Sequence, residues 1–337
     1  MQAVLDAWPT QAWSHGDLAV ADRAQFEALL NEAYGPGRLP ELGETHALLV
    51  VQSGRLAFEH YGDGFSAEQT HASWSMAKSI TQALVGILVA DGKLEIHAPA
   101  DVPEWIFGDP RAQITLDDLL RMSSGLKFVE DYVGGGDQTS DVLEMLYGAG
   151  KADMAAYAAG LPLAHPPGAH WSYSSGTTNI VARCAARALG ASGEAFHRFM
   201  RERLFEPIGM KSPVPKFDAA GTFIGSSYCF STAEDFARFG LLYLRDGMWD
   251  GRRILPAGWV DYARAPTPTP DDADAGYGAQ WWLGFGGEGS FSANGFGSQI
   301  ILVLPDRDTV IVRLGDTSLA HKDDFKRWIG DLAGCFR

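Results

Sequence analysis

Two hairpin patterns at opposite ends of the chain constrain the fold more than any other feature. Each pattern has two apolar runs separated by a short turn, Ser53-Gly54 in the first and Pro305-Asp306-Arg307-Asp308 in the second. The runs are 46–52 and 55–61 near the start, and 299–303 and 310–314 near the end. Hairpins at both ends predict one antiparallel sheet shared by the termini, with helices at 21–34 and 323–336 covering its faces.

The middle of the chain has the periodicity of helices. Apolar residues three and four positions apart predict helices over 75–90, 115–122 and 192–204. We therefore expect an α+β protein with a sheet-containing body from residues 1–80 and 220–337. Residues 81–219 would form a mostly α-helical domain, and a functional site would lie between the two.

Charge and cysteine usage exclude several classes of partner. The 27 basic and 42 acidic residues give a net charge of −15, which disfavours nucleic acids and anionic membranes. Three scattered cysteines are no disulfide framework. The N-terminus has neither a basic segment nor an apolar one, and no apolar run reaches the roughly 18 residues of a membrane span. These features predict a cytoplasmic protein with no membrane partner, either a monomer or a homodimer.

Ser75-Met76-Ala77-Lys78 is the first chemical signal. A serine and a lysine three positions apart share a helical face, so the amine can approach the hydroxyl and take its proton. The helix N-terminus adds N–H groups where an oxyanion would form. The structural alternative is a solvated helix face. However, the neighbours Trp74, Met76, Ala77 and Ile80 are apolar, and a lysine buried among them requires a hydrogen-bonding partner or a functional role.

Two further segments strengthen this signal. Tyr173-Ser174-Ser175 precedes a helical run, and Ala293-Asn294-Gly295-Phe296-Gly297 leads into a C-terminal strand. The alternatives are a helix cap beside a buried tyrosine and a strand with a glycine bulge. As chemistry, an ammonium would pull the Tyr173 phenol toward phenolate and let it relay protons. The glycines would let a strand edge approach a carbonyl group.

In this order and at these separations, the three segments resemble the serine β-lactamase and penicillin-recognising superfamily over roughly residues 40–335. The chain is most similar to the class C-like branch, which includes family VIII esterases, DD-peptidases and 6-aminohexanoate-dimer hydrolases. Segments such as LFEPIGM (204–210) and STAEDFARFGLLYL (231–244) add to the resemblance. It implies the β-lactamase/transpeptidase-like fold: an antiparallel sheet flanked by terminal helices, beside a helical domain.

The resemblance also implies roles for residues of this sequence. Ser75, Lys78 and Tyr173 match the catalytic nucleophile, its basic partner and the tyrosine, and the backbone N–H groups of Ser75 and Phe296 match the oxyanion hole. Ser175 stands where the family usually has Asn, and Ala293 where lactamases have a lysine. The expected substrate-binding residues are Tyr132, Ser175, Asn294 and Gly295, with Tyr132 matching a tyrosine on a mobile loop in hydrolases of nylon oligomers.

These residues predict a serine hydrolase that cleaves a small ester or amide through an acyl-enzyme, without a metal or organic cofactor. Because 288–299 contains no Lys or Arg, we expect weak β-lactamase activity at most. Two alternatives are a non-catalytic binding or sensor module with this fold and an acyltransferase that uses the same acyl-enzyme. Either Lys78 or Tyr173 could be the base.

Overall fold

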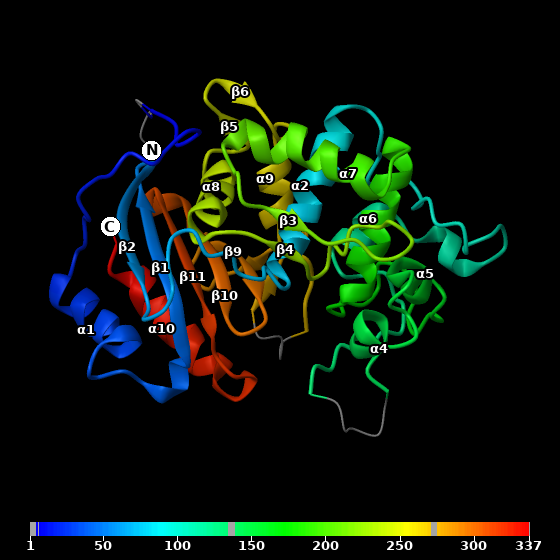
Figure 1. Ribbon diagram of the computed structural model, residues 1–337. Helices are drawn as coiled ribbons and strands as arrows, with labels where there is room; N and C mark the ends of the chain where they lie inside the picture. Colours follow the sequence, from blue (N-terminus) through cyan, green and yellow to red (C-terminus); the bar gives the residue numbers. More distant parts are fainter. Residues whose placement is uncertain (1–4, 6, 134–138, 271–274, 337) are drawn as a thin grey trace.

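A seven-stranded antiparallel sheet is the centre of the computed structural model, which describes residue 5 and residues 7–133, 139–270 and 275–336 (Figure 1). The strand order is β2-β1-β11-β10-β9-β8-β7. The strands are β1 Glu44–Gln52, β2 Arg55–Tyr61, β7 Gly276–Tyr277, β8 Trp282–Leu283, β9 Phe291–Gly295, β10 Gln299–Leu304 and β11 Thr309–Asp316. Both predicted hairpins are present, and β1 pairs with β11, so the ends of the chain share one sheet as predicted.

The sheet separates two hydrophobic cores. On β1, Leu48 and Val50 face the helices α1 (Arg23–Tyr34) and α10 (Lys322–Gly334), whereas Leu49 and Val51 pack on the opposite side. This alternation is the period of two that a strand buried on both faces must follow. Figure 1 shows α1 and α10 together on one side of the sheet, which confirms the predicted terminal helices.

The opposite face packs against α8 (Ala233–Leu244). Gly240 lies where this helix meets the sheet, and a Cβ there would be 2.6 Å from a methyl group of Val310 and 2.8 Å from one of Ile301. Only a glycine permits this approach without displacing the two strands. The segment that contributed to the family resemblance is therefore a packing element.

Helix α2 (Met76–Ala90) is buried along most of its length, from Met76 to Leu88. It contacts β9 on one side and α6 (Ser175–Leu189) on the other, so it connects the sheet to the helical part of the chain. No helix among the described residues is long and apolar enough to cross a membrane.

The other helices of the middle region gather away from α1 and α10 (Figure 1). They are α3 Leu116–Leu120, α4 Asp141–Tyr147, α5 Met154–Ala159 and α7 Gly193–Met200. The remaining elements are α9 Trp259–Arg264 and the short strands β3 Val214–Pro215, β4 Cys229–Phe230, β5 Met248–Trp249 and β6 Arg252–Arg253. The division into a body and a helical domain stays a prediction, and its expected boundary at residue 80 lies inside α2.

Candidate active site

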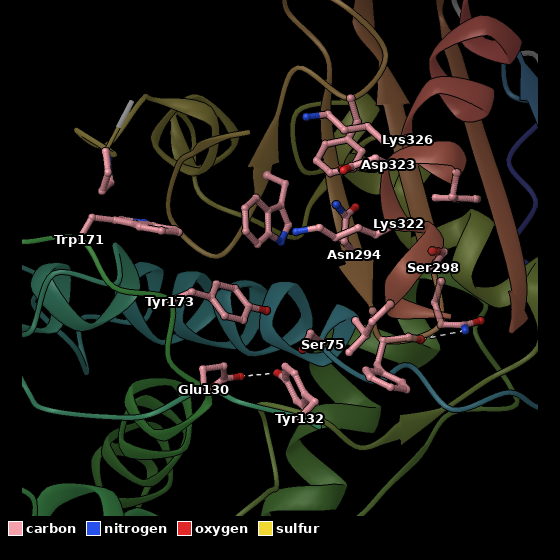
Figure 2. A pocket seen from close by; sticks show the side chains of 18 residues that line it. Ser75, Glu130, Tyr132, Trp171, Tyr173, Asn294, Ser298, Lys322, Asp323 and Lys326 are labelled. Carbon is pink, nitrogen blue, oxygen red and sulfur yellow. Dashed lines mark hydrogen bonds between the residues drawn. The ribbon is translucent and has the colours of Figure 1, made fainter. Parts of the chain in front are cut away.

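Ser75 lies directly before α2, at the N-cap position. A serine there commonly accepts a hydrogen bond from the first helical turn, but the Ser75 side chain makes no such bond. The preceding Trp74 has a φ of 44°, a left-handed conformation that costs a bulky residue about 1–3 kcal/mol. The Ser75 hydroxyl is therefore left for other partners, and it lines a pocket (Figure 2).

Lys78 is one helical turn further on and is buried, with 2% of its surface exposed. Its Nζ donates hydrogen bonds to Ser75 Oγ, Ser175 Oγ and the carbonyl oxygen of Ser226, each at 3.0 Å. Burial lowers the pKa of Lys78 to about 8, although the Glu130 carboxylate acts in the opposite direction. A measurable share of the amine is thus neutral near pH 7 to 8 and could accept the serine proton.

Glu130 completes a chain of polar contacts beneath the serine. Its carboxylate accepts hydrogen bonds from the backbone N–H of Ser175 at 2.8 Å and from the Ser175 hydroxyl at 2.6 Å. The Tyr132 hydroxyl also donates to it (Figure 2). Ser175 therefore accepts from Lys78 and donates to Glu130, so its hydroxyl connects the buried cation to the carboxylate.

Tyr173 precedes α6, and Figure 2 shows its hydroxyl directed toward Ser75. Lys78 Nζ lies 4.8 Å from the centre of its ring. Desolvation raises the pKa of Tyr173, and the Glu130 charge raises it further, while hydrogen bonding with Ser75 and Trp282 lowers it. The sequence predicted a shift toward phenolate, but the pKa of Tyr173 is raised, and burial is the largest cause. Tyr173 stays protonated and is suited to donate a proton.

The end of β9 approaches the serine very closely. A Cβ on Gly295 would lie 2.4 Å from the carbonyl oxygen of Ser73, so no larger residue fits there. This contact brings the following residue, Phe296, to the pocket that Ser75 lines. Among the described residues, neither the Ser75 nor the Phe296 N–H has a hydrogen-bond partner. Both remain available to a substrate oxygen, as an oxyanion hole requires.

Side chains of the neighbouring strands β10 and β11 fix the turn that carries Phe296. Gln299 Nε2 donates to the carbonyl oxygen of Phe296 at 3.0 Å and to that of Gly297 at 3.2 Å. The buried guanidinium of Arg313, on β11, donates to Gly297 O at 3.1 Å. These donors hold the turn by its carbonyl groups and leave its N–H groups directed elsewhere, so the site is preorganised by the sheet.

The pocket beside Ser75 has a volume of about 590 Å³. Aromatic side chains form much of its wall: Trp171, Tyr173, Trp282, Phe285 and Phe325. The rings of Trp171, Tyr173 and Phe285 each pack against Trp282, with Tyr173 and Trp282 5.2 Å apart between centres. The buried Oδ1 of Asn294 has no hydrogen-bond partner among the described residues and lines the same pocket. The pocket thus combines apolar surface with a polar group that a substrate could satisfy.

Two lysines reach this pocket from α10. Lys322 and Lys326 line it together with Asp323, and Figure 2 shows Lys322 beside Asn294. The strand segment 288–299 carries no cation, but the C-terminal helix supplies positive charge to the same pocket. The sequence argument against anionic groups therefore holds for the strand alone and not for the whole pocket.

The structure brings together every residue that the sequence predicted for the site. Ser75, Tyr132, Tyr173 and three residues of the β9 edge (Asn294, Gly295 and Phe296) line the pocket, and Lys78 and Ser175 lie beneath it through hydrogen bonds. Sequence reasoning gave no role to Glu130, Trp282, Lys322 or the carbonyl group of Ser226. Glu130 is two residues before Tyr132, which the resemblance singled out, so a signal for it was present nearby.

Comparisons with known proteins agree with this geometry. Residues 43–335 match the family model described as Beta-lactamase. The 6-aminohexanoate-dimer hydrolase of Paenarthrobacter ureafaciens is 27% identical over 326 residues, which cover 88% of this chain and 80% of that protein.

Solved structures share the fold. A Bacillus anthracis protein provisionally named 6-aminohexanoate-dimer hydrolase superposes with a TM-score of 0.77 and 22% identity, covering 98% of this chain and 88% of its own. A penicillin-binding protein homologue from Caulobacter crescentus gives a TM-score of 0.68 at 17% identity, over 93% and 98% of the two chains.

The contact between Lys78 and Glu130 through Ser175 predicts a shift in the reactivity of Ser75. In Glu130→Gln, loss of the negative charge should lower the pKa of Lys78 further, since Glu130 raises it. Neutral Lys78 would then be present at lower pH. The measurement is the rate of phosphonylation of Ser75 by a fluorophosphonate as a function of pH. The rising part of this pH–rate profile should shift to lower pH by about 1 unit. Glu130→Asp is the matched control, and an unmoved limb in Glu130→Gln would contradict the coupling.

Proposed function

The chain belongs to the beta-lactamase family and is a serine hydrolase that acts on ester or amide bonds; we propose that Ser75 is its nucleophile, Lys78 its general base and Tyr173 its proton donor. The observation that carries this proposal is the 3.0 Å contact between Lys78 Nζ and Ser75 Oγ, in a site where burial lowers the pKa of the lysine to about 8. Only a neutral amine can take the serine proton.

In the first half of the reaction, Ser75 Oγ forms a bond to the substrate carbonyl carbon while Lys78 Nζ takes the hydroxyl proton. The carbonyl oxygen becomes an oxyanion, which accepts hydrogen bonds from the N–H groups of Ser75 and Phe296. When the bond to the leaving group breaks, Tyr173 gives that atom a proton and recovers one from the Lys78 ammonium. The products of this half are an acyl-enzyme and a free alcohol or amine.

In the second half, a water molecule attacks the acyl-enzyme and its proton passes to the same basic group. The carbonyl oxygen again uses the two N–H groups. The bond to Ser75 Oγ then breaks, the serine recovers its proton and the carboxylic acid leaves. Glu130 takes no proton in this scheme; it holds Ser175, which keeps Lys78 Nζ directed at Ser75.

The large pocket favours a linear leaving group with an anionic end. Its aromatic walls suit a methylene chain, and Lys322 and Lys326 bring positive charge to it. The relative from Paenarthrobacter ureafaciens is named for hydrolysis of the 6-aminohexanoate dimer, in which the leaving half is an aliphatic amine that ends in a carboxylate. We therefore propose that the substrates are amides or esters whose leaving group is an amine or alcohol with a carboxylate at its far end.

The contacts of Lys78 count against the non-catalytic alternative. Burying the charge of Lys78 costs several kcal/mol. A binding module would gain nothing from that cost, nor from the contact of Lys78 Nζ with a serine hydroxyl that makes no capping hydrogen bond to its own helix. Acyl transfer would use the same acyl-enzyme with an alcohol in place of water. Product analysis with and without added methanol distinguishes hydrolysis from acyl transfer. Hydrolysis gives the carboxylic acid under both conditions, whereas acyl transfer gives the methyl ester when methanol is present.

Ser75→Ala should remove hydrolysis of p-nitrophenyl butyrate by about 10⁴-fold or more, because the covalent step has no other nucleophile. Intact-mass spectrometry after a fluorophosphonate should show one adduct on the wild type and none on the variant. The exposed Ser66 gives the matched control, Ser66→Ala, which should keep both signals. Full activity in Ser75→Ala would refute the assignment.

Gly295→Ala should lower kcat by roughly 100-fold, the cost of losing one oxyanion donor. The new Cβ would lie 2.4 Å from a backbone oxygen, so β9 must move and carry the Phe296 N–H away from Ser75. The control is Gly334→Ala, where a Cβ meets nothing within 4 Å. Equal kcat values for Gly295→Ala and wild type, with both proteins folded by thermal melting, would contradict the proposed oxyanion hole.

Lys322→Ala should weaken selection for an anionic leaving group. The measurement is the ratio of kcat/KM for 4-(butyryloxy)benzoate to that for the neutral 4-(butyryloxy)benzamide. We expect the ratio to fall about fivefold, equivalent to ~1 kcal/mol for an exposed charge pair. Lys151→Ala controls for net charge, since Lys151 is exposed and does not line the pocket. An equal change in both variants would assign the effect to net charge and not to Lys322.

A further inference from the structure

Ser75 lines a second, smaller pocket that the mechanism above does not use. This pocket has a volume of about 200 Å³. Ser75, Tyr132 and Phe296 line both pockets, and the rings of Tyr132 and Phe296 lie 5.6 Å apart between centres. The nucleophile is therefore at a junction, with this aromatic pair between the two spaces.

The position of Tyr173, the proposed proton donor, indicates which part of a substrate lies in each pocket. Tyr173 lines the large pocket and not the small one, so the leaving atom must face the large pocket to receive its proton. The carbonyl oxygen is directed to the N–H groups of Ser75 and Phe296. A carbonyl carbon under attack has only one substituent left, the acyl chain, and the small pocket is the space that remains for it.

The walls of the small pocket are mostly apolar, and none of the residues that line it is charged. Beyond the three shared residues they consist of Trp74, Leu143, Leu146, Tyr147 and Ser227. The Tyr147 hydroxyl is paired with that of Tyr228 at 2.6 Å. Glu130, which lines the neighbouring pocket, already accepts hydrogen bonds from Ser175 and Tyr132. An ammonium group at the end of an acyl chain would lose its hydration here and gain no carboxylate partner from these walls.

The volume limits the length of the chain. An apolar cavity of roughly 150 Å³ is enough to hold benzene, a molecule of six carbon atoms. A space of about 200 Å³ therefore suits an acyl group of about four to six carbons. A longer chain would meet Leu143 and Leu146 of α4, and Leu146 is buried and fixed in the helical core.

Resting on the function proposed above, we propose that the small pocket is the acyl subsite and that it selects short, uncharged acyl groups. This separates the chain from an enzyme built for the 6-aminohexanoate dimer, whose acyl half ends in an amine. The specificity-determining residues are Leu143 and Leu146, which line the pocket from α4.

The test uses p-nitrophenyl esters that differ only in the acyl group: acetate, butyrate, hexanoate, octanoate, decanoate and 6-aminohexanoate. For the wild-type protein, kcat/KM should peak at butyrate or hexanoate and fall at least tenfold by decanoate. The 6-aminohexanoate ester should be at least tenfold slower than hexanoate. A wild type that prefers decanoate, or that cleaves both six-carbon esters equally, would overturn the proposal.

Variants of α4 locate the effect. Leu146→Ala should raise the ratio of decanoate to butyrate at least tenfold, and Leu143→Ala, at a half-buried position, gives a second variant should Leu146→Ala fold poorly. Leu143→Asp should raise the ratio of the amino ester to hexanoate by supplying a counter-charge. Leu319→Ala, in the wall of the large pocket, should change neither ratio.

The outcomes separate the acyl subsite from the function on which it rests. If no ester is cleaved and no adduct forms on Ser75, the serine hydrolase mechanism fails. If esters are cleaved but the chain-length ratios are the same in wild type and both alanine variants, the acyl subsite alone fails.

Discussion

The burial of the Lys78 ammonium is the constraint on which the site depends. Removing such a charge from water is costly unless it is paired, and three acceptors meet its Nζ at 3.0 Å. They come from the start of α2, the start of α6 and the loop before β4, so three separate segments must assemble before the charge is satisfied. The same burial lowers the pKa of Lys78 to about 8, so part of the amine is neutral near neutral pH, as the proposed role of general base requires.

The sheet supplies the turn after β9, which carries the Phe296 N–H group, and holds this turn in a fixed position. Arg313 on β11 and Gln299 on β10 hold the carbonyl groups of the turn after β9. The N–H group of Phe296 is consequently fixed before any substrate arrives, which is what electrostatic stabilisation of an oxyanion requires. Because β11 also pairs with β1, the first and last parts of the chain must both be in place for this turn to form.

Local patterns predicted the individual elements, the family resemblance predicted distant site residues such as Tyr173 and Phe296, and other distant contributions to the pocket were missed. The hairpins, the terminal helices and the position of Ser75 and Lys78 on one helix follow from spacing over a few residues. Lys322 and Lys326 of α10 lie 27 and 31 residues after Gly295, the last residue of β9, and nothing in their local pattern places them in a pocket. The phenol of Tyr173 was predicted to titrate the wrong way, because spacing reveals a neighbouring cation but not the depth of burial.

Ser175 shows how a departure from a family pattern can be compensated nearby. An asparagine at this position would carry an amide, whereas the serine hydroxyl has one donor and two acceptor sites. It uses one acceptor site for Lys78 and its donor for Glu130, so the smaller side chain needs the carboxylate as a partner. Glu130 is two residues from Tyr132 and accepts from its hydroxyl as well, which ties the tyrosine between the two pockets to the network beneath the nucleophile. A change at Ser175 therefore acts on Lys78 and on the wall of the smaller pocket together, and the two cannot be altered independently through that residue.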